Sequence, residues 1–263
     1  MLCYNDQLDF RYNEGEHKYT VSSLVEDKVW TTPKPVTGVT TICSIMNKEA
    51  LVFWAAKTAA YYFRDNITDL KNKVALAEEA KRAHLEVANA GKRAGSMGHE
   101  LVEQLMLGKT TEPPEDEVLL KQYKSIKDAF KHWRSDFDIS PLASETAVYS
   151  QKYDYAGTFD LAFELNDKVW LIDFKTSNSS YYNPDGIYAE NFAQLGAYMI
   201  AAEEMLNVKI DECAIVNIPK DGGDYKMRSL SDLNLSKTDA KLYFLACLDL
   251  YNKHKTFQWR LNQ

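Results

Sequence analysis

The sequence has 263 residues, of which 45% are hydrophobic and 26% are charged, and it contains only seven prolines. This length suits one α/β-sized domain with at most a small appendage, and the composition excludes disordered, collagen-like and low-complexity chains. The net charge of −7 argues against a protein that coats nucleic acid by bulk electrostatics. It leaves room for a local basic groove.

The cysteine spacing indicates a reducing compartment, and the hydropathy indicates that no segment spans a membrane. The four cysteines lie far apart and form no CxxC pair, which fits neither a zinc knuckle nor a disulfide-rich scaffold. The first residues lack the basic and apolar regions of a signal peptide. The most apolar stretch, 51–63, is short and interrupted by Lys57, so no membrane span is expected. We therefore expect a cytoplasmic protein that does not associate with membranes.

The first half of the chain combines a short β region with helices. Residues 8–23 alternate around Asn13-Glu14-Gly15, which predicts a β-hairpin. Thr40 or Thr41 could cap a short helix. The helices predicted after it are Ala50–Phe63, Leu70–Asn89, Met97–Leu107 and Glu115–Phe137. Gly91, Gly95 and Gly98 are expected to separate the second of these from the third.

The second half has mainly β character. The predicted strands are 144–150, 155–165, 168–176, 211–219 and 224–230, with helices at Ile187–Leu206 and Thr238–Lys255. Helices, a β meander and a crossover helix followed by another strand predict an α/β fold with one mixed sheet. We expect residues 1–35 to form a β-hairpin appendage and residues 36–263 to form the main domain.

A two-residue turn at 166–167 would set the register of the central hairpin. Asp160 then faces Asp173, and Thr158 faces Lys175, with opposed Cβ atoms about 4.5–5.5 Å apart. The other face is apolar and belongs in a core. Its expected pairs are Phe163 with Trp170, Leu161 with Ile172, and Phe159 with Phe174.

These opposed acids carry the main chemical signal. Two carboxylates about 5 Å apart repel by roughly 3 kcal/mol at an effective dielectric constant near 20. Protonation of one acid would relieve the repulsion, and so would a divalent cation such as Mg²⁺. Lys175 lies on the same face as Asp173, so the patch has what metal-assisted phosphodiester hydrolysis needs. The alternative is a pair of solvated strand-end acids, with Lys175 as a salt-bridge partner.

Two helical pairs and one glycine could complete such a site. His99 and Glu103 are four residues apart and share a helical face, so His99 could be a metal ligand or a structural histidine. Gln194 and Tyr198 have the same spacing, which also suits helix–sheet packing. Gly157 would allow the close approach of another backbone or of a ligand.

A basic helical face is a candidate for nucleic-acid binding. It consists of Lys124, Lys127, Lys131 and Arg134, with Tyr123, Phe130 and Trp133 interleaved. Cations with aromatic rings suit single-strand binding through phosphate contacts and base stacking. A solvated helix face explains the charges equally well. Thr176 and Ser177 could donate hydrogen bonds to phosphate or simply end their strand.

Four segments in order resemble the motifs of the PD-(D/E)XK nuclease superfamily. They are GSMGHELVE (95–103), YAGTFDLAF (155–163), LIDFKTS (171–177) and QLGAY (194–198). Within the superfamily they are similar to the RecB-like exonuclease branch, which includes the mitochondrial genome maintenance exonuclease, CRISPR-adaptation nucleases and many phage exonucleases. Residues 36–60 are similar to the lead-in of phage and prophage members, and the resemblance covers about residues 36–205. It implies a restriction-endonuclease-like core, with a central mixed β-sheet flanked by helices.

The resemblance also implies roles for individual residues. The metal ligands would be His99, Asp160, Asp173 and the backbone carbonyl of Phe174. The catalytic residues would be Asp160, Asp173, Lys175, Gln194 and Tyr198, of which the last two match a QxxxY element that braces the site and contacts the substrate strand. Glu145 sits where relatives often have an acid, and its role stays open. Several relatives carry an iron–sulfur cluster, but the wide separation of Cys213 and Cys247 predicts none here.

The function implied is a Mg²⁺- or Mn²⁺-dependent DNA exonuclease that acts on single strands or DNA ends. Recombination, replication or repair of phage or prophage DNA would be its setting, with a phage recombination protein or single-strand-binding protein as a candidate partner. A non-catalytic nucleic-acid-binding or assembly module that retains the fold is the alternative. A glycosidase pair also needs carboxyl groups about 5–5.5 Å apart, but Lys175 beside the acids makes that class less suitable.

Overall fold

The computed structural model describes residues 1–26, 29–46, 49–68, 72–137, 139–177 and 183–262. Its strands are β1 (Leu2–Cys3), β2 (Leu8–Asn13), β3 (Lys18–Glu26), β4 (Val29–Trp30), β5 (Lys34–Gly38), β6 (Ser140–Ser150), β7 (Tyr155–Leu165), β8 (Lys168–Lys175), β9 (Glu212–Asn217) and β10 (Lys226–Ser229). Its helices are α1 (Val39–Cys43), α2 (Glu49–Asn66), α3 (Lys73–Met106), α4 (Glu117–Asp136), α5 (Ala189–Leu206) and α6 (Lys237–Leu261), with a short 3-10 helix, η2, at Ser231–Leu233.

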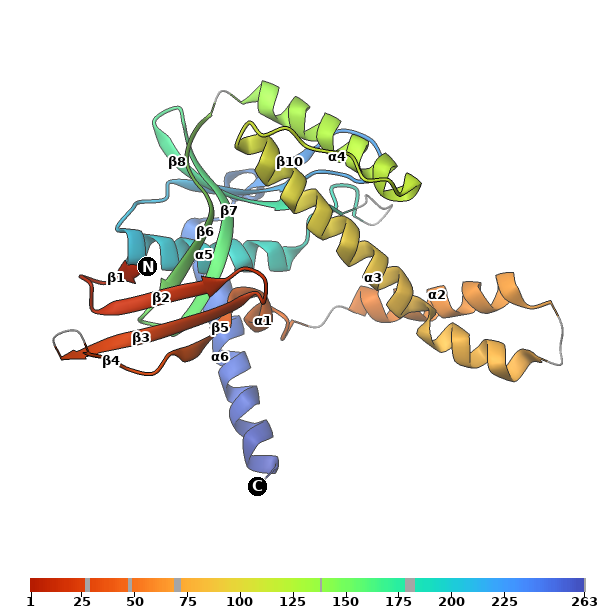
Figure 1. Cartoon of the computed structure of the whole chain (residues 1–263), viewed down its shortest axis with the longest axis horizontal. Coiled ribbons are helices and arrows are strands. Elements are labelled where there is room, and N and C mark those ends of the chain that lie inside the picture. Colours follow the sequence, from red (N-terminus) through yellow and green to blue (C-terminus); the bar gives the residue numbers. More distant parts are fainter. Residues whose placement is uncertain (27–28, 47–48, 69–71, 138, 178–182, 263) are drawn as a thin grey trace.

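The described strands form one ten-stranded mixed sheet. Its main order is β1-β2-β3-β5-β7-β8-β9-β10, while β4 pairs with β3 and β6 pairs with β7. The β5–β7 and β8–β9 pairs are parallel, and the other pairs are antiparallel. Helices lie against this sheet, so the expected α/β architecture with a central mixed sheet is confirmed (Figure 1).

Two hydrophobic clusters hold the helices against opposite faces of the central strands. Helices α1, α5 and α6 supply Ile42, Phe192 and Phe244 to the first cluster. The C-terminal half of α3 and the whole of α4 supply Leu101 and Trp133 to the second. At about 25 cal/mol per Å² of apolar surface, this burial is the main favourable term in folding. The central strands are therefore fixed from both sides.

The central hairpin follows its sequence closely. Strand β7 spans the predicted residues, and Leu165 pairs with Lys168 across a two-residue turn. Asn166 and Asp167 have φ angles of 52° and 58°, as a type I′ turn requires. Asn and Asp tolerate this left-handed conformation better than other non-glycine residues. The predicted turn is confirmed.

The N-terminal strands extend the central sheet. The predicted hairpin is present, with β2 ending at Asn13 and β3 beginning at Lys18. Strand β3 pairs with β5, and β5 pairs in parallel with the start of β7. The proposed division between residues 35 and 36 falls inside β5, and the separation into an appendage and a main domain stays a proposal.

Helix α3 is one continuous helix of 34 residues, so the expected break at the glycines is wrong. A glycine costs a helix interior only about 1 kcal/mol relative to alanine, which the packing around this helix outweighs. Gly98 has a packing reason, because a Cβ there would lie 2.7 Å from Cγ2 of Thr176. The predicted start of the preceding helix at Leu70 lies outside the described residues. Thr40 and Thr41 lie inside α1, whose N-cap is Gly38.

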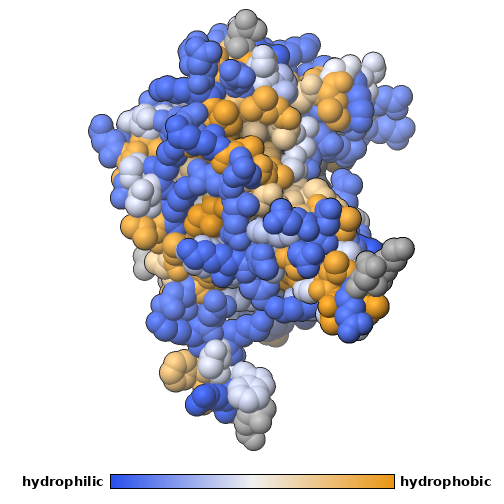
Figure 2. Space-filling model, turned by 90° about the vertical axis from the view of Figure 1, so that its left-hand side faces the viewer, coloured by the Kyte–Doolittle hydropathy of each residue, from blue (hydrophilic) through white to orange (hydrophobic). Residues whose placement is uncertain are grey.

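Two helical segments project from the body. Helix α2 and the first half of α3 pack together and extend away from the sheet (Figure 1). The last turns of α6 stand clear of the molecule at the lower end of Figure 2, which otherwise shows a mostly hydrophilic face with small groups of hydrophobic residues. None of the helices in the described ranges is long and apolar enough to span a bilayer.

Candidate active site

The candidate site lies at an interruption along one edge of β7. Strand β6 pairs with the other edge over most of its length. On the interrupted edge, β5 pairs only with Tyr155 and Ala156, and β8 pairs only from Leu161 onward. Residues 157–160 pair with neither strand on this edge. Here β5 turns into α1 and β8 diverges, which opens the sheet.

Asp160 fills part of this interruption with its side chain. Its Oδ2 accepts a hydrogen bond of 2.5 Å from the backbone N–H of Phe174. The carboxylate therefore takes the place of a strand-to-strand hydrogen bond and keeps β7 and β8 apart. A charge-assisted hydrogen bond of this kind fixes the orientation of the carboxylate.

Three side chains from three elements converge at this point. His99 of α3, Glu145 of β6 and Asp160 each offer a ligand atom, and these atoms lie within 4.8 Å of one another. His99 Nδ1 lies 3.7 Å from Asp160 Oδ2. Imidazole nitrogen and carboxylate oxygen are donors that divalent cations accept. The donor set therefore fits a metal ion.

Glu145 is held in an unusual backbone conformation for a strand residue. Its neighbours Ser144 and Thr146 pair with Leu161 and Phe159, so the register places Glu145 across from Asp160. Its φ is 43°, in the left-handed region, where a non-glycine residue is disfavoured by about 1–3 kcal/mol. The sequence left the role of this acid open, and the structure places it among the potential ligands. Its position across from Asp160 in the β6–β7 pairing was the signal that could have identified it.

Asp173 and Lys175 form a buried ion pair beside the cluster. Lys175 Nζ contacts Asp173 Oδ2, and the carboxyl side chain is only 3% exposed. Burial alone would lower the pKa of Lys175, but the neighbouring carboxylates of Asp173 and Asp160 raise it. Lys175 is therefore an ammonium at neutral pH in this arrangement.

The surroundings raise the pKa values of two of these acids. Burial, followed by the charge of Asp173, raises the pKa of Asp160 to about 6. The Glu145 side chain is exposed at the surface of the cluster, yet partial desolvation, followed by the charges of Asp160 and Glu103, raises its pKa to about 8. Like charges close together favour the protonated form until a positive charge stabilises them. A divalent cation would supply that charge.

Tyr198 reaches the site from α5. Tyr198 is 5% exposed, and its ring lies against Gly157, where a Cβ would be 2.5 Å from Cε1 of the ring. Burial, followed by the charges of Asp173 and Asp160, raises the pKa of its phenol well above the usual value. Gln194 lies one turn earlier, and among the described residues its buried Oε1 accepts no hydrogen bond. A close approach does occur at Gly157, but it is made by a side chain, the Tyr198 ring, and not by the backbone or ligand that was expected.

The predicted pairing across the hairpin holds only on the side next to its turn. Leu161 pairs with Ile172, and Phe163 pairs with Trp170. The β7–β8 ladder ends there, so Asp160 meets β8 through its side chain. Phe159 belongs to the cluster under α5 and α6, whereas Phe174 belongs to the cluster under α3 and α4. The expectation that Phe159 and Phe174 share a face of the sheet is wrong. The alternation of side chains along β7 is broken where the strand separates from β8, so Phe159 and Leu161 point to opposite faces.

The proposed base-stacking surface on α4 is wrong in its aromatic part. The rings of Tyr123, Phe130 and Trp133 are buried against the sheet. Hydrophobic residues at helical spacing usually face the core, and the three rings of α4 do so here. They are therefore not available to stack on bases.

The four cations of α4 have different surroundings. Arg134 donates hydrogen bonds to the carbonyls of Phe137 and Ile139. Lys127 donates to Thr111 Oγ1 and to the hydroxyl of Tyr123. Lys124 and Lys131 are exposed. Nucleic-acid contact by this face remains a prediction.

Thr176 and Ser177 continue the chain beyond Lys175. Thr176 packs against Gly95 and Gly98 of α3. The Ser177 hydroxyl donates to the carbonyl of Gly186, and its backbone N–H donates to Asn217 Oδ1. Both residues therefore fix the end of β8, and contact with phosphate remains a prediction for them.

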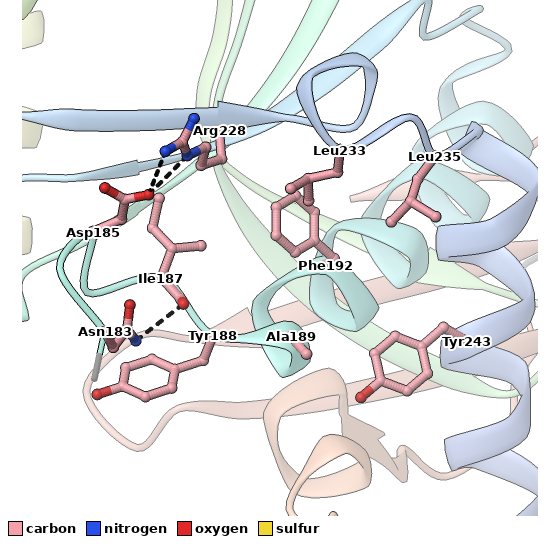
Figure 3. A pocket seen from close by; sticks show the side chains of 10 residues that line it. All are labelled: Asn183, Asp185, Ile187, Tyr188, Ala189, Phe192, Arg228, Leu233, Leu235 and Tyr243. Atoms are coloured by element: carbon pink, nitrogen blue, oxygen red, sulfur yellow. Dashed lines mark hydrogen bonds and ion pairs between the residues drawn. The ribbon is translucent and has the colours of Figure 1, made fainter.

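A separate pocket of about 340 Å³ lies at the N-terminal end of α5 (Figure 3). It contains none of the predicted catalytic residues. Its wall carries the ion pair between Arg228 and Asp185, and Asn217 donates to the carbonyl of Asp185. Asn217 pairs with Lys175 in the β8–β9 register. The pocket wall is thus bonded to the strand next to the site.

Comparisons with known proteins identify one family. The family model described as the PD-(D/E)XK nuclease superfamily matches residues 68–242. Among solved structures, the alkaline exonuclease LHK-Exo from Laribacter hongkongensis is similar, with 13% identity and a TM-score of 0.32 over 63% of this chain and 85% of that chain. LHK-Exo in complex with dAMP gives 15% identity and a TM-score of 0.30 at the same coverage. No curated protein sequence matches the chain.

Proposed function

The chain belongs to the PD-(D/E)XK nuclease superfamily, and from this we propose that it is a divalent-metal-dependent DNA exonuclease. Its mixed sheet with flanking helices is the restriction-endonuclease-like core of that superfamily. We further propose that it acts on single-stranded DNA or DNA ends, during recombination, replication or repair of phage-type DNA.

One observation supports this proposal above the others. His99, Glu145 and Asp160 converge at the interruption of the sheet, and the Asp173–Lys175 ion pair adjoins them. Segments distant in sequence thus bring carboxylates, an imidazole and an ammonium together. The core does not require this arrangement, since burying charged groups is unfavourable unless they are paired or bind an ion.

The residues divide into a metal-binding group and a substrate group. We propose that His99, Glu145, Asp160 and Asp173 hold Mg²⁺ or Mn²⁺, with help from the carbonyl of Phe174. When bound, the cation supplies Lewis-acid polarisation of the scissile phosphate and acidifies the attacking water.

Lys175 acts as a cation in this scheme. Its raised pKa keeps it protonated at neutral pH, so the ammonium orients the attacking water and offsets the negative charge that builds up on the phosphate. Asp173 holds the ammonium in place through their ion pair.

Tyr198 and Gln194 position the substrate. The buried Tyr198 ring braces β7 at Gly157. We propose that Gln194, one turn earlier on α5 and with a buried Oε1, braces the site in the same way. Lys124 and Lys131 would attract the DNA backbone at longer range.

End-labelled oligonucleotides test the proposal. Single- and double-stranded substrates, each blocked at one end, are incubated with Mg²⁺, Mn²⁺ or EDTA. Stepwise shortening in either metal, and none in EDTA, is the expected result. Asp173→Asn should abolish shortening, whereas Asp167→Asn in the exposed turn of the same hairpin should not.

The alternative is a non-catalytic nucleic-acid-binding or assembly module. Calorimetric titration with Mn²⁺ separates the two functions. Absence of metal binding together with intact DNA in every reaction would refute the nuclease proposal and favour the module.

A further inference from the structure

The β2–β3 hairpin places a row of aromatic rings beside the candidate site. Tyr12 pairs with Tyr19 in the register, and Phe10 pairs with Val21, so these side chains share one face of the hairpin. The Phe10 ring stacks at 5.7 Å on Tyr149 of β6 and at 6.1 Å on Tyr19. The Tyr19 ring stacks at 4.8 Å on Tyr12, with 19° between the planes. The row thus runs from a buried ring outward to Tyr12.

Tyr19 joins this row to the interrupted edge of β7. Its hydroxyl lies 3.0 Å from Oγ1 of Thr158, two residues before Asp160. Its ring also lies against Gly38, at the point where β5 ends. Figure 1 shows the β2–β3 hairpin next to β5, which pairs with the start of β7. The hairpin therefore borders the opening in which the acids converge.

Tyr12 reaches the same opening through Tyr19. The two rings are stacked, and Tyr19 contacts Thr158 in the stretch of β7 that pairs with neither β5 nor β8.

Tyr12 ends the row at the surface. The residue is partly exposed, and its hydroxyl lies 2.9 Å from Nδ1 of the exposed His17, whose ring is tilted by 49° to that of Tyr12. A tyrosine held by neighbouring rings loses little conformational freedom when another flat group stacks on it. Every nucleobase offers such a flat face, so the contact would tolerate any sequence.

We propose that the β2–β3 hairpin forms one wall of the active site and that Tyr12 stacks on the base of a nucleotide next to the scissile phosphate. This inference rests on the proposed nuclease function and assigns a substrate-positioning role to a segment outside the four sequence motifs. The acids of the site repel the phosphate backbone, and a stacked base would hold the strand without placing more negative charge there.

An abasic-site scan tests the stacking contact. Short polythymidine oligonucleotides carry one abasic site, moved one position at a time, and kcat/KM is measured for each. For the wild-type protein, one position should lower kcat/KM by about 5- to 150-fold, the factor that one base–aromatic stack contributes. Tyr12→Ala should show a similar loss on the intact oligonucleotide and no further loss at that position. Tyr12→Phe keeps the ring and should retain the wild-type profile.

Controls separate stacking from folding and from cleavage. Arg11→Ala changes the neighbouring residue, whose side chain is 70% exposed and belongs to the opposite face, and should leave the abasic profile unchanged. Tyr12→Leu replaces Tyr12→Ala if the latter lowers the melting temperature. The same oligonucleotides are also bound to a Lys175→Met protein and followed by fluorescence anisotropy, which requires no cleavage.

The two proposals fail in different ways. Intact DNA in all reactions, with a Tyr12-dependent loss of binding at one abasic position, refutes the nuclease activity and supports the stacking contact. Cleavage with the same abasic profile in the wild-type, Tyr12→Ala and Tyr12→Leu proteins overturns the stacking contact and leaves the nuclease activity standing.

Discussion

Replacement of Lys175 by methionine removes the ammonium and keeps most of the side-chain volume. The carboxyl side chain of its partner Asp173 is 3% exposed and would be left without its cation. Loss of one partner from a buried ion pair costs about 3–5 kcal/mol. A chain of this size loses about 2–4 °C per kcal/mol, so the melting temperature in EDTA should fall by about 6–20 °C.

The same substitution should slow cleavage more than unfolding alone explains. An ammonium aimed at a developing charge contributes about 10²- to 10³-fold to kcat. We therefore expect Lys175→Met to lose at least that factor at temperatures where it is fully folded. Mg²⁺ should restore part of the lost stability, because it compensates the unpaired negative charge of the acids, but it should not restore the rate.

Differential scanning calorimetry and an end-labelled oligonucleotide assay measure the two effects. Lys168→Met is the matched control, because Lys168 begins the same strand and is exposed to solvent. It should leave both the melting temperature and the rate unchanged. Wild-type cleavage by Lys175→Met would refute the catalytic assignment, and an unchanged melting temperature in EDTA would refute the buried ion pair.

Three further changes test other parts of the site. Gly157→Ala places a Cβ 2.5 Å from the Tyr198 ring, so it should destabilise the fold by about 1–3 kcal/mol and lower the rate, as unfolding and cleavage assays would show. In the wild-type protein, Mn²⁺ affinity should rise from about pH 6.5 to about pH 8.5, because the Glu145 carboxyl, whose pKa is raised to about 8, holds a proton that the metal must displace. Glu145→Gln removes this carboxyl and should make the rise smaller, which calorimetry at several pH values would measure. Gly98→Ala should push α3 from the end of β8 and weaken Mn²⁺ binding, whereas Gly91→Ala, which meets nothing within 4 Å, should stabilise the helix by up to about 1 kcal/mol.

The interruption of β7 explains how a β-sheet can host such a charged site. A continuous ladder would bring β8 against residues 157–160 and satisfy their backbone groups. Instead β5 stops after Gly38, and Asp160 takes over one hydrogen bond with its side chain. The acidic side chains thus lie at the unpaired edge of β7, and the hydrophobic clusters on both faces of the sheet keep the adjoining strands rigid. Rigid support of this kind holds catalytic groups in their productive geometry.

The sequence alone determined the local elements of the central hairpin. Alternating residues over 155–165 and the Asn166-Asp167 turn predicted β7 and its pairing with β8 near the turn, because both depend on neighbouring residues. The motif order also identified His99, Asp160, Asp173, Lys175, Gln194 and Tyr198 as candidate site residues.

Tertiary structure decided how these residues meet. The end of the β7–β8 ladder depends on where β5 stops, and the place of Glu145 depends on the pairing of β6 with β7. The glycines of α3 lie against Thr176, which is far away in the chain, so their role became clear only in the folded structure. Burial of the α4 aromatic rings likewise depends on the sheet beneath them. Local sequence patterns do not predict these features. Each feature depends on the free energy of contacts between segments that are distant in the sequence and meet only in the folded protein.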